Sequence, residues 1–318
     1  MKNYCPKIAA KRQVFPRVDH GFSRARFPVL ARTKITSVLT ERNHVNALSV
    51  LAKWLFRQTG KHLKNLSRCE AEDYLNERAN TVKQKTLDLD RQVLNMHFQF
   101  EEKLDYVVSR VFTTRYDRAY TKRQVEYLLT KAPPALNFSI QLAIDAGLRS
   151  MELITIANMS SQLPSNRTWH PSKFVGREMD MPFSVHGKGG LVREVRLNPQ
   201  LAAMLLEHQR PAAARVSHCG AHLKSHFELI GGNTLCRQFS RLSQKHLGFS
   251  YGVHGLRYVF AQTRFLDLIC IGHPPGEALK ILAQEMGHFA VTNTLVYLHA
   301  RFDSDEQIVS LPGASLIS

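Results

Sequence analysis

The sequence has no long apolar run, few cysteines and a shortage of acidic residues. No stretch approaches the ~18 consecutive apolar residues that a membrane-spanning helix needs, and no lipidation signal is present. The cysteines are odd in number, form no CxxC pair and follow no secretory signal, which favours free thiols in a reducing, cytoplasmic setting. They are Cys5, Cys69, Cys219, Cys236 and Cys270.

A phosphate-binding Walker loop and paired metal-binding carboxylates are also missing from the sequence. Chemistry driven by ATP or by two metal ions is therefore disfavoured. We expect no cofactor and no metal.

The charge is strongly unbalanced towards basic residues. Lys and Arg number 43 against 26 Asp and Glu, which gives a formal net charge of +17. Such an excess destabilises a folded chain through self-repulsion, and a polyanionic partner is its commonest explanation. Double-stranded DNA is the preferred partner, which predicts a nucleoid-associated protein, and an anionic membrane surface is the weaker alternative.

The pattern along the chain divides it into five parts. Residues 1–35 form a basic N-terminal arm that lacks apolar periodicity, so a stable helix is not expected there; the arm is either a solvated tail or a DNA contact. We predict a helical domain over 36–112, a linker over 113–118, a second domain over 119–302 and an apolar tail over 303–318. The tail is broken by Pro312 and Gly313 and is expected to pack on its own body or on an adjacent copy.

Apolar residues recur at helical spacing between about Ser37 and Arg110. Three or four short amphipathic helices are predicted there, one of them beginning after Ser67 and one running from Val82 to about Phe100. The second domain is predicted to start with a helix at Thr121 and then to alternate helices with one hairpin. The expected fold class is mainly α with a small β-sheet.

Two segments of the second domain combine glycine turns with a cationic side chain. In AGLRSMEL, Gly147 permits a tight entry and Arg149 lies near the start of a predicted helix that runs through Ile156, where free backbone N–H groups favour an anion. The stretch from Val185 to Leu197 predicts a β-hairpin with Lys188 near its tip. Taken alone, Arg149 is more simply a surface ion pair and Lys188 a solvated turn residue.

Two further segments place histidines near a second arginine and a tyrosine. His254 and Arg257 are three apart and share a face if helical, and His288 follows Gly287 nine residues before Tyr297. Each of these residues is more often structural than catalytic when it is considered alone.

Together, these residues occur in the order Arg, Lys, His-x-x-Arg, Gly-His, Tyr, which resembles the active site of the tyrosine recombinases (phage integrases). The resemblance spans about 180 residues, from Tyr120 to Arg301. It implies that residues 36–112 are a helical domain that binds the DNA core site and that 119–302 are the catalytic domain. Tyr258 is a departure, because many relatives have His after the second arginine.

The resemblance also implies a role for each residue. Tyr297 would attack phosphorus and form a 3′-phosphotyrosine, while Lys188 protonates the departing 5′-oxygen. His254 would accept or donate the proton at the nucleophile. The groups that would hold the non-bridging phosphate oxygens are Arg149, Arg257 and His288. A free phenol has a pKa of about 10, so such a nucleophile needs a base or a positive field at neutral pH.

The function expected from this resemblance is site-specific DNA recombination for mobile-element integration or excision. A homotetramer acting on two DNA sites is implied, with accessory DNA-bending or directionality proteins as further candidate partners. The alternatives are a type IB topoisomerase and a non-catalytic DNA-binding or architectural protein.

Histidines cluster outside the motif, between Pro211 and Ser250. Helical spacing of four could bring His218, His222 and His226 together beside Cys219, and a Zn²⁺ site is conceivable. Surface or DNA-facing histidines are the preferred interpretation.

Overall fold

The computed structural model describes residues 4–20, 33–112, 118–187, 190–218 and 221–298. The chain divides into two compact units, one built from residues up to 114 and the other from residues 115–218 and 222–318. Each unit is described by itself below. No helix in the described part of the chain is both long enough and apolar enough to span a membrane.

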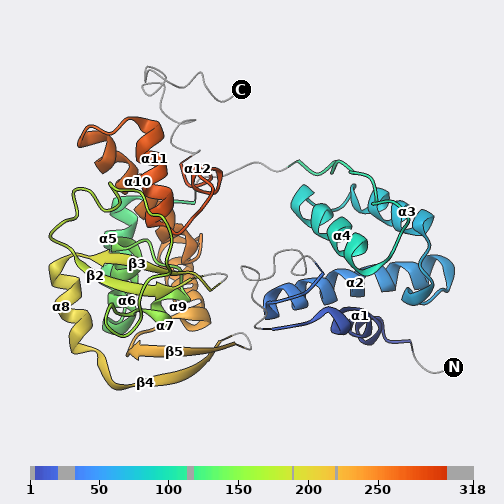
Figure 1. The fold of residues 1–318 in the computed structure, drawn as a ribbon, viewed down its shortest axis with the longest axis horizontal. Coiled ribbons are helices and arrows are strands. Elements are labelled where there is room, and N and C mark those ends of the chain that lie inside the picture. The colour runs from blue at the N-terminus through green and yellow to red at the C-terminus, as the bar shows by residue number, and fades with distance from the viewer. Residues whose placement is uncertain (1–3, 21–32, 113–117, 188–189, 219–220, 299–318) are drawn as a thin grey trace. The chain divides into compact units, whose positions relative to one another are not determined.

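The first unit is all-helical, as predicted (Figure 1). Its helices are α1 (Pro6–Val14), α2 (Val38–Thr59), α3 (Arg68–Arg78) and α4 (Gln84–His97). Ser37 caps α2 by accepting a hydrogen bond from the Thr40 backbone, and Ser67 forms a capping box with Glu70 at the start of α3. Both side chains satisfy backbone N–H groups that the first turn leaves unpaired, so the sequence located these helix starts correctly.

The arm predicted over residues 1–35 contains a helix, which corrects the expectation that none would be stable there. Helix α1 starts at Pro6 and packs on α2, with Ala10 and Val14 buried. Ile35 is also buried and is bridged to Val18. Most helical stability in proteins comes from tertiary packing rather than from local pattern, so a helix with only two buried side chains leaves little periodic signal. Residues 21–32 of the arm lie outside the described part.

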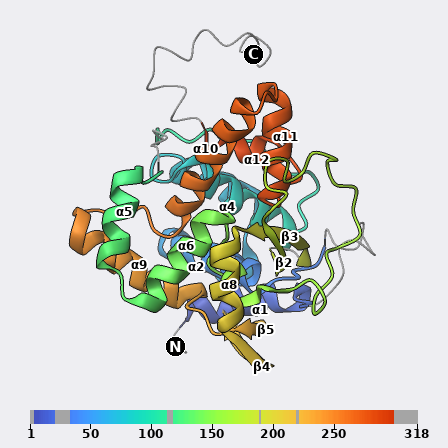
Figure 2. The same ribbon diagram turned by 90° about the vertical axis from the view of Figure 1, so that its left-hand side faces the viewer.

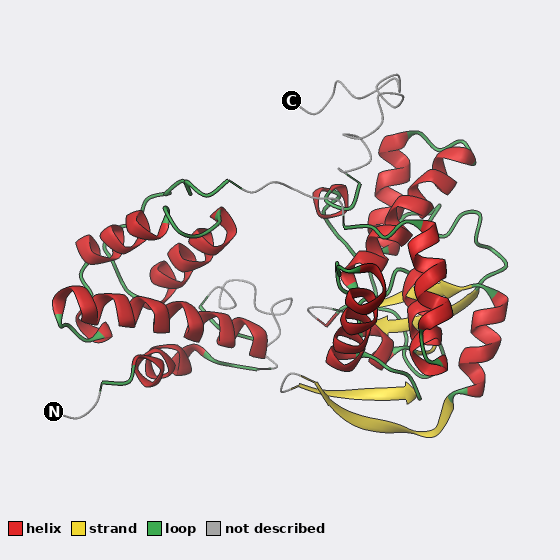
Figure 3. Cartoon of the chain, turned by 180° about the vertical axis from the view of Figure 1, so that it is seen from behind, coloured by secondary structure: helices red, strands yellow, loops and turns green. Residues whose placement is uncertain are grey.

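The second unit surrounds a small antiparallel sheet with helices (Figure 3). Its sheet has the order β1-β2-β3, and a separate pair of strands follows in the chain. Before and within the sheet lie α5 (Lys122–Lys131), α6 (Pro134–Asp145), α7 (Glu152–Thr155), β1 (Ala157–Asn158), β2 (Met181–His186) and β3 (Val192–Leu197). After it come α8 (Pro199–Glu207), β4 (Gln209–His218), β5 (Ala221–Phe227), α9 (Gly232–Leu247), α10 (His254–Cys270), α11 (Pro275–Glu285) and α12 (Thr292–Leu295). The expected fold class, mainly α with a small sheet, is confirmed.

The predicted hairpin is formed by β2 and β3. Val185 pairs with Arg193 and Phe183 with Val195 across the two strands. Phe183, Val185 and Val195 are buried in the core of the unit, as alternation along a half-buried strand requires. Residues 188 and 189 at the turn lie outside the described residues.

The histidine segment is a pair of strands rather than a helix, which corrects the spacing argument. His218 ends β4, and His222 and His226 lie on β5. His222 and His226, four apart on the single strand β5, are separated by about 13 Å, so the three imidazoles do not converge as they would on one face of a helix. No cluster of three or more metal-ligating side chains is found among the residues that the structure describes.

Helices α10 and α11 pack against each other (Figure 2). Phe265, Leu268, Ile281 and Leu282 are buried in an apolar cluster between them, and the ring of Tyr297 packs into the same cluster. This cluster holds α10, which begins at His254, against α11, which ends shortly before His288. The predicted tail, residues 303–318, and its expected docking on an adjacent copy lie outside the described residues.

Candidate active site

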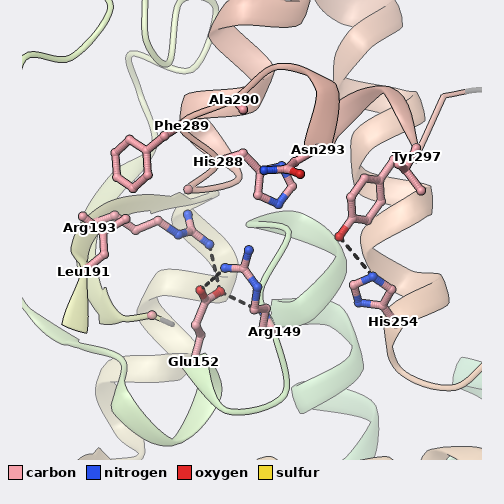
Figure 4. Close-up of a pocket in the computed structure, with 13 residues that line it drawn as sticks. Arg149, Glu152, Leu191, Arg193, His254, His288, Phe289, Ala290, Asn293 and Tyr297 are labelled. Carbon is pink, nitrogen blue, oxygen red and sulfur yellow. Dashed lines mark hydrogen bonds and ion pairs between the residues drawn. The ribbon is translucent and has the colours of Figure 1, made fainter. Parts of the chain in front are cut away.

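An open cleft of about 670 Å³ gathers residues from four separate segments of the second unit. They come from the turn after α6, the β2–β3 hairpin, the start of α10 and the segment that joins α11 to Tyr297 (Figure 4). The residues lining it are Arg149, Glu152, Gly187, Leu191, Arg193, His254, Gly287, His288, Phe289, Ala290, Asn293, Val296 and Tyr297.

Tyr297 and His254 form one side of this cleft. The Tyr297 hydroxyl lies 3.0 Å from Nε2 of His254, the first residue of α10. The Tyr297 ring packs on Tyr258 with 4.5 Å between centroids, and its backbone oxygen accepts a hydrogen bond from Gln262. The phenol oxygen is therefore held beside an imidazole nitrogen, as proton transfer between the two requires.

His288 is fixed by the turn that ends α11. Gly287 has a φ of 73°, a left-handed conformation that glycine adopts without steric cost. A Cβ atom at this position would lie 2.7 Å from Cδ of Arg193, so a larger residue would displace that side chain. Nδ1 of His288 is 2.8 Å from the Thr294 hydroxyl, which orients the ring over the cleft.

The turn after α6 positions Arg149 at the cleft. Gly147 has a φ of 57°, and a Cβ atom there would collide with the Phe260 ring. The helix predicted beyond Arg149, running through Ile156, is present as the single turn α7, which ends at Thr155. The Arg149 side chain remains 26% exposed and donates a hydrogen bond of 2.7 Å to Glu152.

Glu152 is the buried centre of a cluster of guanidinium groups, which we call the Glu152 cluster: Glu152, Arg149, Arg193 and Arg257. The Glu152 carboxylate is fully buried and lies 2.7 Å from Nη1 of Arg149, 2.9 Å from Nη2 of Arg193 and 3.7 Å from Nη1 of Arg257. Burial by itself raises the pKa of this carboxyl, but the three arginines outweigh burial and lower the pKa to about 2. The carboxylate is therefore ionised at every physiological pH.

Neither Glu152 nor Arg193 was singled out from the sequence. Arg193 is fully buried and also donates to the backbone oxygen of Glu285, so it ties the hairpin to α7 and α11. One sequence signal could have identified it: along β3 it shares a face with the apolar Val195 and Leu197, which places a charge in the buried register.

Arg257 lies behind the cleft wall. It donates to the backbone oxygens of Gly147 and Met286, and burial, then repulsion from Arg149, lower its pKa to about 10. It stays cationic at neutral pH. The Nε atoms of Arg193 and Arg257 are buried and have no hydrogen-bond partner among the described residues. Each therefore keeps one N–H donor that no described residue accepts.

Both cleft histidines are held neutral. Burial, followed by the positive charges of Arg257 and Arg149, lowers the pKa of His254 to about 4 and that of His288 to about 3. A neutral imidazole can accept a proton on one nitrogen while it donates from the other.

The structure thus brings together five of the six residues predicted from the sequence, namely Arg149, His254, Arg257, His288 and Tyr297. Lys188 lies outside the described residues. Gly187 and Leu191, close to it on either side in the chain, both line the cleft.

The chain has the fold of the tyrosine recombinases. It resembles the XerH site-specific recombinase bound to a palindromic difH substrate, at 15% identity over 97% of this chain and 96% of that one, with a TM-score of 0.56. It also resembles a lambda integrase dimer bound to a COC′ core site, at 15% identity over 87% and 76% of the two chains, with a TM-score of 0.52. A lambda integrase tetramer bound to a Holliday junction aligns at 16% identity over 86% and 75%, with a TM-score of 0.53. No family model and no curated protein matches the sequence.

Proposed function

We propose that the chain is a site-specific DNA recombinase that cleaves and rejoins DNA strands through a 3′-phosphotyrosine at Tyr297. The observation that carries this proposal is the 3.0 Å contact between the Tyr297 hydroxyl and a neutral His254, in a cleft whose floor is cationic. A nucleophile, a proton acceptor and a positive field are the three things that a phenol needs to attack a phosphodiester.

The charge of the Glu152 cluster supports this chemistry. Three guanidinium groups surround one carboxylate, so two positive charges are left uncompensated while the histidines are neutral. A phosphodiester carries one negative charge, and attack by a tyrosine oxygen that has lost its proton raises this to two in the transition state. The cluster therefore matches the transition state better than the ground state, which is what accelerates a reaction.

The proposed steps use the described side chains as follows. Tyr297 attacks phosphorus and its proton passes to Nε2 of His254, while Arg149 and His288 donate to the non-bridging oxygens. Arg257 contributes its charge from behind the wall, 5.9 Å from the Tyr297 ring centre. Removal of one phosphate-binding donor is expected to cost roughly 3–4 kcal/mol of barrier.

Lys188 is proposed to protonate the departing 5′-oxygen. The phosphotyrosine bond preserves the energy of the phosphodiester, so a 5′-hydroxyl can attack it in the reverse direction and rejoin the strand. No nucleotide cofactor is needed for this cycle.

The proposed partner is double-stranded DNA, bound by a homotetramer on two sites during mobile-element integration or excision. Support comes from the net charge of +17 and from the fold relatives, which include a recombinase bound to its DNA substrate and an integrase tetramer bound to a Holliday junction. The first unit, with its helices α1–α4, is proposed to bind the core of the site.

The test is covalent capture of DNA. The full chain is incubated with a pool of randomised duplexes that carry staggered nicks, so that a short strand is lost after cleavage and the adduct accumulates. Adducts that survive denaturant are isolated, and sequencing of the attached strand recovers the preferred site. We expect the released strand to carry a 5′-hydroxyl that a kinase can label.

Tyr297→Phe should abolish the adduct, because no other group replaces the phenol oxygen. Tyr258→Phe is the matched control, since it removes the neighbouring phenol oxygen and should leave the adduct in place. An adduct that persists in Tyr297→Phe would move the nucleophile elsewhere. Relaxation of supercoiled plasmid without any preferred sequence would indicate topoisomerase activity instead.

A further inference from the structure

The cleft has an apolar side that the proposed chemistry does not use. Figure 4 shows Phe289 and Leu191 on the opposite side of the cleft from Tyr297 and His254, with His288 and Arg149 between them. Phe289 is 62% exposed although it directly follows His288, whereas Leu191 is buried. A large exposed aromatic ring beside a catalytic group offers a surface for another flat group.

One face of the Phe289 ring is already occupied by a cation. The guanidinium carbon of Arg167 lies 4.1 Å from the ring centre. The loop that carries Arg167 is fastened to β3, because the Ser165 backbone N–H donates to the Val192 oxygen and the Ser165 hydroxyl accepts from the Val192 N–H. Arg167 and Phe289 are thereby held together at the cleft edge, with the remaining ring surface open to solvent.

The direction of attack by Tyr297 determines which part of the DNA would lie beside Leu191 and Phe289. In phosphoryl transfer the attacking and leaving oxygens lie roughly in line on opposite sides of phosphorus. With Tyr297 attacking from one side, the departing 5′-oxygen leaves towards the side that carries Leu191 and Phe289. Leu191, which directly precedes β3, lines the cleft on this same side.

We propose that Phe289 and Arg167 form a subsite for the nucleoside that carries the leaving 5′-oxygen, which we call the leaving-nucleoside subsite. Its base stacks on the open face of Phe289, while Arg167 supports the other face and lies near the next phosphate. Aromatic rings and arginine planes stack on any base, so the subsite contributes position rather than sequence preference. This proposal rests on the proposed function.

The subsite predicts a specific effect on strand rejoining. Rejoining requires the incoming 5′-hydroxyl strand to be held in line with the phosphotyrosine, so Phe289→Ala should raise the KM for that strand. Loss of one stacked base predicts a reduction of roughly 5- to 150-fold in kcat/KM for rejoining. Phe289→Trp retains a stacking surface and should retain most of the activity.

The decisive measurement is a double-mutant cycle between protein and DNA. Isolated wild-type and Phe289→Ala adducts are each offered an incoming strand with a normal or an abasic first nucleoside. If the base stacks on Phe289, the abasic strand slows the wild-type protein but slows Phe289→Ala little further, so the two effects are not multiplicative. The matched control is Tyr127→Ala, which removes an exposed ring that pairs with Lys131 on α5, and it should behave as wild type.

The outcomes separate this proposal from the one on which it rests. A wild-type protein that forms no adduct overturns both. A wild-type adduct combined with multiplicative effects, or with normal rejoining by Phe289→Ala, overturns the leaving-nucleoside subsite alone. A fold defect is checked by thermal unfolding, and because Phe289 is largely exposed, the variant should melt as wild type does.

Discussion

Replacing Glu152 with glutamine tests whether one carboxylate holds the site together. The substitution preserves the size of the side chain but removes the negative charge that faces Arg149, Arg193 and Arg257. Three guanidinium groups, of which those of Arg193 and Arg257 are fully buried, would then repel one another without compensation. The nearest matched control is Glu194→Gln, because Glu194 pairs with Arg196 at 3.0 Å while both side chains are 25% exposed.

The expected loss follows from the pKa of the carboxyl. A fall from the ordinary 4.5 to about 2 corresponds to a stabilisation of about 3 kcal/mol by the ionised form. Because the pKa is lowered in the folded state, this stability is present above pH 4.5 and is lost as the pH falls through about 2. Breaking a buried ion pair costs about 3–5 kcal/mol in other proteins, whereas the partly exposed control pair should cost less than about 1 kcal/mol.

The assay uses the two tryptophans, which lie one in each unit: Trp54 in α2 and Trp169 before β2. In a Trp54→Phe background, the fluorescence of Trp169 reports unfolding of the second unit alone. A loss of about 3 kcal/mol in a unit of roughly 200 residues predicts a fall in Tm of about 6–12 °C. Sulfate should raise the Tm of Glu152→Gln more than that of wild type, since an oxyanion supplies the missing charge.

A Tm shift in Glu152→Gln that is no larger than the shift in Glu194→Gln would contradict the role given to the carboxylate. Such a result would mean that the arginines are adequately solvated or paired without the carboxylate. An equal sulfate response in Glu152→Gln and wild type would refute the narrower claim that the variant has gained an unpaired positive charge.

Two further predictions concern a buried histidine of the first unit and the glycine that precedes His288. Burial, together with the charge of nearby His44, lowers the pKa of His97 from 6.5 to about 4, so only the unfolded chain takes up this proton between those values. The first unit should lose about 2 kcal/mol of stability between pH 8 and pH 5, followed by Trp54 fluorescence in a Trp169→Phe background; an unchanged unfolding midpoint would contradict the assignment. Gly287→Ala should impair adduct formation because the new Cβ would collide with the Arg193 side chain. The control is Gly248→Ala, which has a similar φ of 79° and no atom within 4 Å of the new Cβ, so it should lower stability through backbone strain alone and leave adduct formation unchanged. Equal effects of the two variants on adduct formation would argue against the contact with Arg193.

Local signals in the sequence were sufficient to locate several structural elements. Ser37, Ser67 and Thr121 each cap the helix that was predicted to follow. The alternation around Val185 and Val195 correctly predicted the β2–β3 hairpin. These features depend on side-chain–backbone hydrogen bonds and strand periodicity within a few residues, which a single sequence displays.

Elements that depend on distant packing were not predictable in the same way. Helix α1 is stabilised by contact with α2. The strands β4 and β5 occupy a segment in which histidines at four-residue intervals were considered at helical spacing. The order of the motif along the chain was enough to single out Arg149, His254, Arg257, His288 and Tyr297. It gave no indication of Glu152 as their neighbour, because that relation arises only when α7, β3 and α10 meet.

An acidic residue, Glu152, lies in a site that is proposed to bind phosphate because the arginine side chains around it must be held in fixed positions. Three guanidinium groups without a counter-charge would separate or draw in water, and each would then need to be repositioned as the reaction began. The carboxylate neutralises one of the three positive charges. Its ion pairs also hold Arg149, Arg193 and Arg257 in position before any substrate binds. Two positive charges remain, against one negative charge on a phosphodiester and two in the proposed transition state. On the proposed chemistry, the acid therefore assists catalysis without touching the substrate, because a field that is already oriented costs no reorganisation when the charge develops.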